Sequence, residues 1–202
     1  MKKALSILLI LATVLTLFCS CKKEKTDETG VYSYVILDDD TAKIIKYNGT
    51  EPVVELQIPS SLDDYTVTVI GKEAFKDVQT ITVVRTPDTL TEIEDYAFAN
   101  SSIKKALMNR SPLLTKIGAY AFSECKNLVQ TDMPASLETL GDYAYYYCEN
   151  LRIAQFRGDN ASIANFSFDA CPKVVFYIKS TFVKVKDYAE AYNFDIKLTD
   201  NR

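Results

Sequence analysis

The hydrophobic positions of the chain repeat with a period of about 23 residues. Five aromatic residues stand 23, 24, 23 and 23 positions apart, namely Phe75, Phe98, Phe122, Tyr145 and Phe168. A small residue directly precedes each of them, and an aliphatic residue lies five positions earlier, at Ile70, Ile93, Ile117, Leu140 and Ile163. A unit of this length with a single strand cannot bury its apolar side alone, so it must stack on its neighbours. The pattern therefore predicts a repeat solenoid.

Each coil also contains a short β-prone run between its aromatic positions. The runs read VVELQIP, ITVVRTP, IKKALMN, LVQTDMP and LRIAQFR, and three of them end at Pro59, Pro87 and Pro134. Proline lacks the amide hydrogen that a ladder needs, so it marks where strand pairing stops. We expect one short parallel strand in each coil of 23–24 residues, with neighbouring strands about 4.8 Å apart. The five coils are expected to span residues 53–173.

Side chains that alternate along these strands should form an outward face. By alternation, the pairs on this face are Glu55 and Gln57, Val83 and Arg85, Lys105 and Leu107, Gln130 and Asp132, Ile153 and Gln155, and Phe176 and Ile178. Solenoids use long mixed surfaces of this kind to bind proteins, although an exposed sheet with ordinary solubilising residues gives the same pattern. The candidate binding residues on this face are Arg85, Lys105, Leu107, Gln130, Asp132 and Gln155.

Both ends of the repeat read as caps that cover the terminal apolar faces of the stack. Residues 31–52 contain two strand-like runs joined by a polar turn and predict an N-terminal β-hairpin cap. Residues 174–202 begin with a last strand. The strand is followed by apolar residues at helical spacing, namely Val185, Tyr188, Ala189 and Tyr192. We expect a C-terminal helical cap that starts behind Ser180 or Thr181.

Two stretches carry a resemblance to a known repeat family. CKNLVQTDMPASLETLGDYAY and VTVIGKEAF resemble the BspA-like leucine-rich repeats, whose pattern is roughly Cys-x-x-Leu-x-x-Ile-x-Leu-Pro, a spacer and Ile-Gly-x-x-Ala-Phe. The resemblance covers about residues 31–192. The chain departs from the family glycine at Glu94 and Ala164, and from the family proline at Asn109 and Arg157. The resemblance implies a leucine-rich-repeat solenoid of the kind that adhesive bacterial proteins contain.

The N-terminus reads as an export signal. Two lysines precede an apolar run that ends at Phe18, which is too short and wrongly flanked for a membrane-spanning helix of about 20 residues. The LFCSC ending resembles a bacterial lipoprotein signal, because the small residue Ser20 precedes Cys21. This resemblance implies a signal peptide over residues 1–20 and lipidation of Cys21. Simple cleavage at a nearby small residue is the alternative.

The segment after the signal is polar and mixed in charge. Residues 21–30 read CKKEKTDETG and predict a flexible tether between the lipid and a domain that spans residues 31–202. Loss of the two signal-peptide lysines changes the formal net charge from −4 to −6. Nucleic-acid binding needs a concentrated basic face, so we expect no nucleic-acid partner. The expected location is the cell envelope, with a lipid anchor in the outer membrane or at the cell surface.

The residues most often used in catalysis are scarce. The chain has no histidine, which excludes histidine-dependent hydrolases, zinc proteases and histidine-ligated haem sites. Its six glycines fall mostly at repeat turns and form no phosphate-binding loop. The LDDD stretch at residues 37–40 lacks the glycine and distal glutamate of a calcium loop and reads as a solvated turn. We therefore expect no enzyme activity, no cofactor and no metal site.

The stretch DYAYYYCEN, residues 142–150, contains four tyrosines and a cysteine. Tyr145 belongs to the aromatic column, so it should be core. Tyr146 and Tyr147 fall in columns that are otherwise mostly polar, and tyrosine gives a large contact area at little entropic cost. They form a second candidate binding point, unless both pack flat on the surface or on an adjacent coil.

Three cysteines share one column of the repeat, at Cys125, Cys148 and Cys171. The same column holds valine and serine in the earlier coils, so it should be a small buried site in which free cysteine behaves as a small hydrophobe. Export to an oxidising compartment leaves one disulfide as the alternative.

Three functions fit these features. The first is a non-catalytic, lipid-anchored envelope protein whose solenoid binds an extracellular or envelope protein, as the resemblance to adhesive proteins implies. The second is a surface carbohydrate-binding accessory of nutrient uptake, in which Tyr146 and Tyr147 stack on the sugar rings of a glycan. The third is a structural protein of the envelope.

Overall fold

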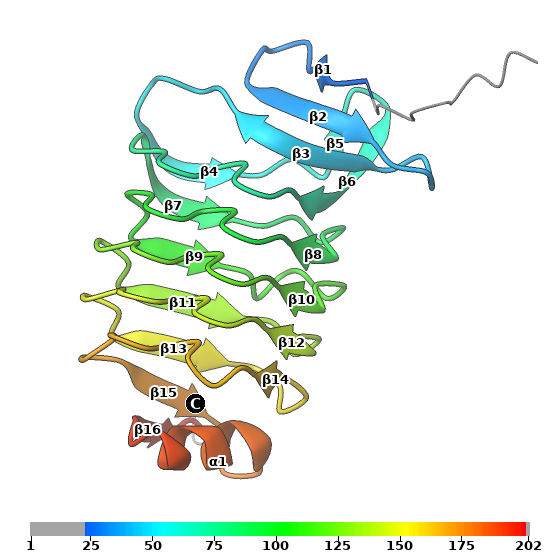
Figure 1. The fold of residues 1–202 in the computed structure, drawn as a ribbon. Coiled ribbons are helices and arrows are strands. Elements are labelled where there is room, and N and C mark those ends of the chain that lie inside the picture. Colours follow the sequence, from blue (N-terminus) through cyan, green and yellow to red (C-terminus); the bar gives the residue numbers. More distant parts are fainter. Residues whose placement is uncertain (1–22, 201–202) are drawn as a thin grey trace, which may run out of the picture.

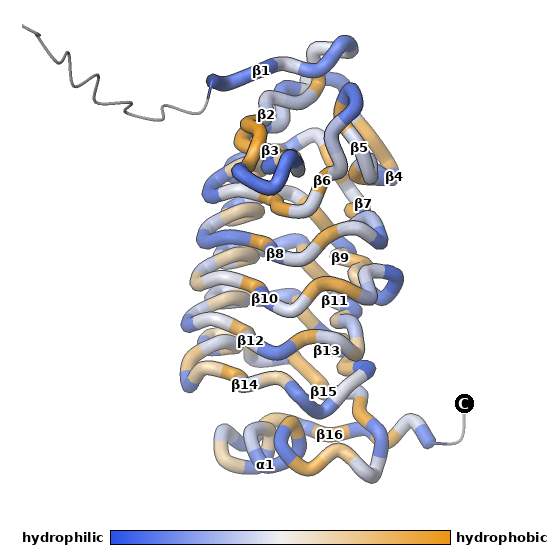
Figure 2. Tube along the Cα trace, turned by 90° about the vertical axis from the view of Figure 1, so that its right-hand side faces the viewer, coloured by the Kyte–Doolittle hydropathy of each residue, from blue (hydrophilic) through white to orange (hydrophobic). Residues whose placement is uncertain are grey.

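The computed structural model describes residues 23–200, which form a stack of coils between two caps (Figure 1). The signal peptide and Cys21 lie outside the described residues. Two sheets run along the stack, and each coil passes from one sheet to the other. Hydrophobic residues recur at the same place in successive coils (Figure 2). This is the solenoid that the period of the sequence predicts.

A seven-stranded sheet forms one side of the stack and is parallel throughout. Its strands are β4 (Val53–Gln57), β7 (Ile81–Arg85), β9 (Lys105–Leu107), β11 (Gln130–Met133), β13 (Ile153–Phe156), β15 (Val175–Ile178) and β16 (Asp195–Leu198). The expected strand of every coil is present. β16 extends the sheet past β15 and was not predicted, because DIKL lies after the repeat and lacks its pattern.

A nine-stranded sheet forms a second side. Its strands are β1 (Lys25–Thr26), β2 (Tyr32–Ile36), β3 (Ala42–Tyr47), β5 (Ser61–Leu62), β6 (Tyr65–Ile70), β8 (Glu92–Ile93), β10 (Lys116–Ile117), β12 (Thr139–Leu140) and β14 (Ser162–Ile163). Each coil therefore has two strands where one was expected. The second strand contains the aliphatic position that recurs before each aromatic residue. From β8 to β14 it is only two residues long, so periodicity alone does not reveal it.

The N-terminal cap is the predicted hairpin, in which β2 and β3 pair antiparallel and β3 then pairs parallel with β6. The second half of the predicted tether is also structured, since β1 pairs with β2. Hydrogen bonds to Asp27 explain why this segment is structured. Its Oδ1 accepts a hydrogen bond of 2.6 Å from the amide of Tyr32, and its Oδ2 accepts from the amide and hydroxyl of Thr29. The hydrogen bonds fix the chain before the hairpin starts.

The C-terminal cap contains the predicted helix, α1 (Lys184–Ala191), which buries Val185 and Ala189 against the last coil. The predicted caps Ser180 and Thr181 are not used. The carboxylate of Asp159, from the preceding coil, accepts hydrogen bonds from the amides of Val183 and Val185 at 2.7 and 3.0 Å. A negative charge is favourable at this end of a helix because the first amides have no partner within it. The cap is therefore joined to the solenoid by a polar contact as well as by apolar packing.

The predicted aromatic column is the centre of the core. Neighbouring rings lie 4.8 to 5.1 Å apart and within 18° of parallel, and all are almost fully buried, at Phe75, Phe98, Phe122, Tyr145 and Phe168. The spacing matches the distance between paired strands of about 4.8 Å. Burial of each side chain contributes about 1.5–3 kcal/mol. Tyr47 of β3 adds one more ring on top of Phe75, so the N-terminal cap continues the column.

Two turn positions of the coils have left-handed backbone geometry without glycine, the first in four coils and the second in all five. The second of these positions has φ between 54° and 61° and holds Asp77, Asn100, Glu124, Tyr147 and Ala170. This geometry costs roughly 1–2 kcal/mol for a residue with a Cβ atom. Hydrogen bonds between coils offset the cost. The amide of Glu124, for example, donates to the carbonyl of Tyr146 at 2.7 Å, and that of Tyr147 donates to the carbonyl of Asp169 at 3.1 Å.

The three cysteines of the repeat column are buried and free. Each thiol donates to the carbonyl of the aromatic residue one coil earlier. The Sγ–O distances are 3.1 Å for Cys125 to Phe98, 3.1 Å for Cys148 to Phe122 and 3.0 Å for Cys171 to Tyr145. The thiols therefore satisfy backbone oxygens along the core.

Candidate functional site

The outward strip, defined as the outward-facing side chains from β4 to β15, follows from the strand register. One column holds Glu55, Val83, Lys105, Gln130, Ile153 and Val175, and the other holds Gln57, Arg85, Leu107, Asp132, Gln155 and Tyr177. The register brings the six candidate residues of the strip onto two adjacent columns of one face. Only the last coil differs from the expectation.

The prediction that Phe176 and Ile178 face outward is wrong, because both are fully buried. Ile153 pairs with Val175, which lies 22 residues later instead of 23. A shift of one residue moves every side chain of a strand to the other face. Val175 and Tyr177 therefore complete the strip.

Three of the candidate residues are held by neighbouring residues of the same or adjacent coils. Arg85 forms an ion pair with Glu55. Asp132 is only 5% exposed, and its two oxygens accept hydrogen bonds of 2.7 and 2.8 Å from Arg157. The amide of Gln155 donates to the carbonyl of Tyr177 at 3.0 Å. A new ligand would have to displace these contacts.

Lys105 and Leu107 are the candidates that the strip leaves most available. Lys105 is exposed, and within residues 23–200 it has no ion pair or side-chain hydrogen bond. Leu107 is half-buried and lies directly beside Arg85 in the register. An apolar side chain beside a free cation gives this part of the strip both elements that protein interfaces combine.

A pocket of about 420 Å³ opens at the carboxyl ends of β4, β7 and β9. It is lined by Gln57, Ser60, Arg85, Thr86, Pro87, Asp88, Leu107, Asn109 and Arg110. Within the described part of the chain, the guanidinium of Arg110 makes no ion pair. Guanidinium groups bind carboxylates through two parallel hydrogen bonds. Arg110 is therefore the free guanidinium that this pocket offers to an acidic side chain, because Arg85 is already paired with Glu55 and Asp88 adds a negative charge to the lining. Sequence reasoning missed Arg110, although the replacement of the family proline by Asn109 marks this turn as unusual.

The tyrosine edge, made of Tyr143, Tyr146 and Tyr147, lies on a different side of the coil. The ring of Tyr146 packs edge-on against Tyr143 at 5.5 Å, and Tyr147 lies 5.8 Å from Tyr146. Tyr147 is 38% exposed, and the ammonium of Lys126 lies 5.3 Å from the centre of its ring. The structure thus brings both candidate tyrosines together, but it covers part of their ring faces.

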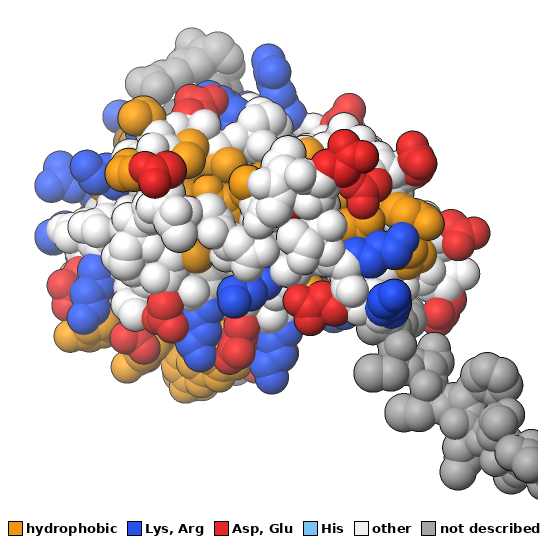
Figure 3. All heavy atoms as spheres, turned by 90° about the horizontal axis from the view of Figure 1, so that it is seen from above, with side chains coloured by type: hydrophobic (Ala, Val, Ile, Leu, Met, Phe, Trp, Pro, Cys, Tyr) orange, Lys and Arg blue, Asp and Glu red, His pale blue; other side chains and the backbone are white. Residues whose placement is uncertain are grey.

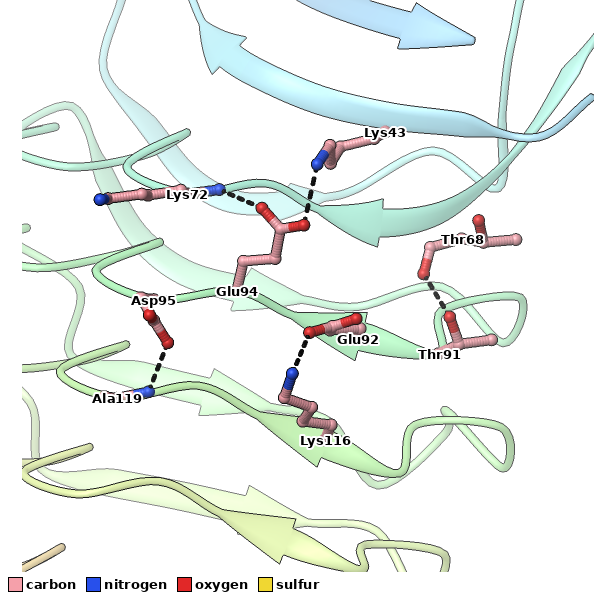
Figure 4. A network of polar contacts seen from close by, with 9 residues as sticks. All are labelled: Lys43, Thr68, Lys72, Thr91, Glu92, Glu94, Asp95, Lys116 and Ala119. Carbon is pink, nitrogen blue, oxygen red and sulfur yellow. Dashed lines mark hydrogen bonds and ion pairs between the residues drawn. The ribbon is translucent and has the colours of Figure 1, made fainter. Parts of the chain in front are cut away.

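The face of the nine-stranded sheet carries charges that satisfy one another (Figure 4). Glu94 replaces the family glycine and accepts hydrogen bonds from the amide of Lys72 at 2.8 Å and from the ammonium of Lys43 at 2.9 Å. Lys116 pairs with Glu92 at 2.8 Å. Glu94, which departs from the repeat, therefore joins the N-terminal cap to the coils through Lys43. The end view of that cap shows charges of both signs and only limited hydrophobic patches (Figure 3).

Two ionisable groups of the core have raised pKa values because they are buried. Burial raises the pKa of Cys125 to about 11 and also raises that of Tyr145. Within residues 23–200, no group of three potential metal ligands comes together. Over the same residues, no helix has the length and apolar character to cross a membrane. The outward strip, with its pocket, and the tyrosine edge remain as the candidate binding surfaces.

The sequence pattern described as the BspA type leucine rich repeat region matches residues 47–175 in six copies. The chain belongs to this family. This is one copy more than the five coils that the spacing of the aromatic residues predicts. Folds of this class typically act as scaffolds for protein interaction and not as catalysts. No curated protein matches the chain in sequence.

Solved structures of bacterial leucine-rich repeat proteins share the fold. A leucine-rich repeat protein of T. pallidum is 18% identical with a TM-score of 0.59, over 81% of this chain and 79% of that one. A leucine-rich cell surface protein of Faecalibacterium prausnitzii is 24% identical with a TM-score of 0.52, over 77% and 45%. The pneumococcal vaccine antigen PcpA is 16% identical with a TM-score of 0.55, over 77% and 40%. This chain thus spans less than half of the last two proteins.

Proposed function

We propose that the chain is a lipid-anchored protein of the bacterial envelope whose solenoid binds a protein partner through the outward strip. The export signal and Cys21 support the anchor. The family supports an interaction scaffold, and one protein of similar fold is described as a leucine-rich cell surface protein. A parallel sheet with side chains in two regular columns offers a long contact face.

The observation that carries this proposal is a pair of cations without acidic partners beside an apolar side chain of the outward strip. Lys105 on β9 and Arg110 in the turn after it make no ion pair in the described residues, and they flank half-buried Leu107. Free cations around an apolar centre attract a partner with acidic groups and give it an apolar contact.

The test uses the mature domain and fractionated envelope and extracellular proteins as probes. The double change Arg85→Glu and Lys105→Glu is expected to weaken capture of the partner at least tenfold, because it reverses the charge at the centre of the strip. Lys46→Glu, an exposed charge on β3 of the other sheet, is the matched control and should leave capture unchanged. Arg85 also loses its exposed pair with Glu55, which costs about 0–1 kcal/mol, so folding is checked by thermal unfolding. Equal capture by all three proteins would contradict the proposal.

The anchor is tested separately in the full chain. Cys21→Ala is expected to abolish incorporation of labelled fatty acid and to release the protein from the membrane fraction. Protease treatment of intact cells then distinguishes the exterior from the periplasm. Acylation of the variant at the wild-type level would contradict the assignment of Cys21.

The tyrosine edge supports the carbohydrate-binding alternative, since Tyr147 keeps 38% of its surface exposed. The pair Tyr146→Ala and Tyr147→Ala should abolish glycan binding under this alternative and leave the protein partner bound. If neither this pair nor the charge reversal changes any binding, the structural role is favoured.

A further inference from the structure

A second pocket lies between the last coil and the C-terminal cap. It has a volume of about 330 Å³ and is lined by Asn165, Phe166, Phe168, Asp169, Ala170, Cys171, Pro172, Tyr188, Tyr192 and Phe194. The size falls within the range of about 300–1,000 Å³ of small-molecule sites. Five of the lining residues are aromatic. Neither the outward strip nor the tyrosine edge contributes to it.

The pocket occupies the place where an aromatic stack is interrupted. Beside the buried column, a second stack of rings runs along the edge of the coils, with centres 4.9, 5.0 and 5.4 Å apart, through Tyr96, Tyr120, Tyr143 and Phe166. Phe166 is the last ring, and within the described residues Tyr143 is its only ring neighbour. Phe166 is 48% exposed. Its free face is directed toward the cap, because Tyr143 covers the opposite face.

The walls of the pocket are held in place by packing and a hydrogen bond. Phe168 is fully buried and Cys171 is almost so. Phe194 stacks on Phe176 at 5.1 Å, and the hydroxyl of Tyr188 donates to the carbonyl of Asn165 at 3.3 Å. A ring that enters finds the free face of Phe166 already in position, so little conformational entropy is lost on binding.

The rim of the pocket is polar. Within the described part of the chain, the side-chain amide of Asn165 and the hydroxyl of Tyr192 have no hydrogen-bond partner, and the carboxylate of Asp169 accepts one bond, from the amide of Ala170. An aromatic or alkyl ligand would fill the pocket but leave these groups unbonded. A ligand with hydroxyl groups around an apolar face would satisfy them.

We propose that this pocket binds a sugar ring, which stacks its apolar face on Phe166 and donates or accepts hydrogen bonds at Asn165, Asp169 and Tyr192. Asp169 is the only charged lining residue, so the site selects neutral sugars over acidic ones. The ring takes the position of the next member of the interrupted stack. The site is separate from the protein-binding strip, so the two can be occupied together.

The test uses nuclear magnetic resonance titration of the mature domain with neutral oligosaccharides of glucose, galactose and N-acetylglucosamine. At least one is expected to bind with a dissociation constant of about 1 mM or below, which corresponds to about 4 kcal/mol. Phe166→Ala should weaken this binding at least tenfold, whereas Phe166→Tyr should retain it. Tyr96→Ala, which removes the ring at the opposite end of the same stack, is the matched control and should bind as the wild type does.

Three probes oppose the proposal. N-acetyltyrosinamide represents an aromatic side chain of a peptide, choline represents a cation bound by aromatic rings, and a uronic acid oligosaccharide represents an acidic sugar. Stronger binding of any of these than of every neutral sugar overturns the proposal. Absence of neutral sugar binding, or equal binding by Phe166→Ala, overturns it as well. Capture of the protein partner by Phe166→Ala should be unchanged, so the two sites are tested independently.

Discussion

The hydroxyl of Tyr145 lies 2.8 Å from the hydroxyl of Thr131 in the interior of the solenoid, and both residues are fully buried. The other rings of this column in the coils are phenylalanine, and the neighbours of Thr131 in its own column are Ala106 and Ala154. The only phenol in the coil part of this column thus faces the only hydroxyl among those strand positions. A buried hydroxyl without a partner costs about 1–3 kcal/mol, so the two substitutions are energetically linked.

Replacement of one partner should destabilise the domain more than replacement of both. Thr131→Val leaves the phenol of Tyr145 buried without a partner, and we expect the free energy of unfolding to fall by about 1–3 kcal/mol. Tyr145→Phe alone should cost less, because the smaller threonine hydroxyl can turn toward a backbone carbonyl. In the double variant, the loss should be smaller than the sum of the single losses by at least about 0.5 kcal/mol. Urea unfolding followed by circular dichroism measures all four proteins.

The control for this cycle is Phe122→Tyr, which places a phenol one coil earlier. The strand position that corresponds to Thr131 one coil earlier is Ala106, which has no hydroxyl to bond this phenol. Phe122→Tyr should therefore destabilise the domain, and Phe122→Tyr with Ala106→Thr should recover part of the loss. Strict additivity of Thr131→Val and Tyr145→Phe would show that the two hydroxyls do not interact.

The architecture could be predicted because the information about it is periodic. Phe98, Phe122 and Tyr145 recur at nearly constant spacing, and stacking of equal coils places them in one column. The same argument correctly predicted that the cysteine column is small and buried. Each of these conclusions depends on position within the coil and not on any contact between specific side chains.

The contacts that break the repeat could not be predicted in this way. Asp159 caps α1 from 24 residues away along the chain, and Arg157 replaces the family proline while neutralising Asp132 on the adjacent strand. Both depend on the geometry of neighbouring coils, which the period does not encode. The reversed alternation at Phe176 has a similar cause, since one residue is missing between the buried position and the strand. The pocket at Phe166 could not be predicted either, because it forms only where the C-terminal cap packs on the last coil.

Acid should selectively weaken the N-terminal cap through Asp27. Partial burial acts to raise the pKa of this carboxyl. Hydrogen bonds from Thr29, Tyr32 and Val31 lower the pKa by more than burial raises it, so the pKa lies below the ordinary value of 3.8. A carboxyl whose pKa is lower in the folded state stabilises that state above its unfolded pKa. The stabilisation is lost as the pH falls through the folded pKa.

We therefore expect Asp27→Asn to lower the free energy of unfolding by about 1 kcal/mol at neutral pH, and the difference from wild type to shrink as the pH falls below about 4. Thermal unfolding of both proteins over this range measures the effect. Asp64→Asn, at an exposed carboxyl of the first coil, is the control and should show little loss at any pH. A loss in Asp27→Asn that does not depend on pH would exclude the charge as the cause.

The three repeat cysteines should remain unreactive until the solenoid unfolds. Burial raises the pKa of Cys125 to about 11 and that of Cys148 well above its ordinary value of 9.0, so thiolate, the reactive form, is scarce at neutral pH. In a domain that starts at residue 23, a thiol reagent should label none of the three in the native state and all three in denaturant. A single reactive thiol after unfolding without reductant would instead indicate a disulfide.

The same burial predicts a loss of stability in alkali. A thiol whose pKa is raised in the folded state keeps its proton at pH values at which the same thiol in the unfolded chain has lost it. Its contribution is fully present below the unfolded pKa of about 9 and declines as the pH rises toward the folded value. Cys125→Ser should remove part of this decline, because Ser101 shows that a hydroxyl fits the same column one coil earlier. Unfolding measured from pH 7 to 11 should therefore give a shallower slope for Cys125→Ser than for wild type, and equal slopes would mean that the buried thiol does not cause the alkaline loss.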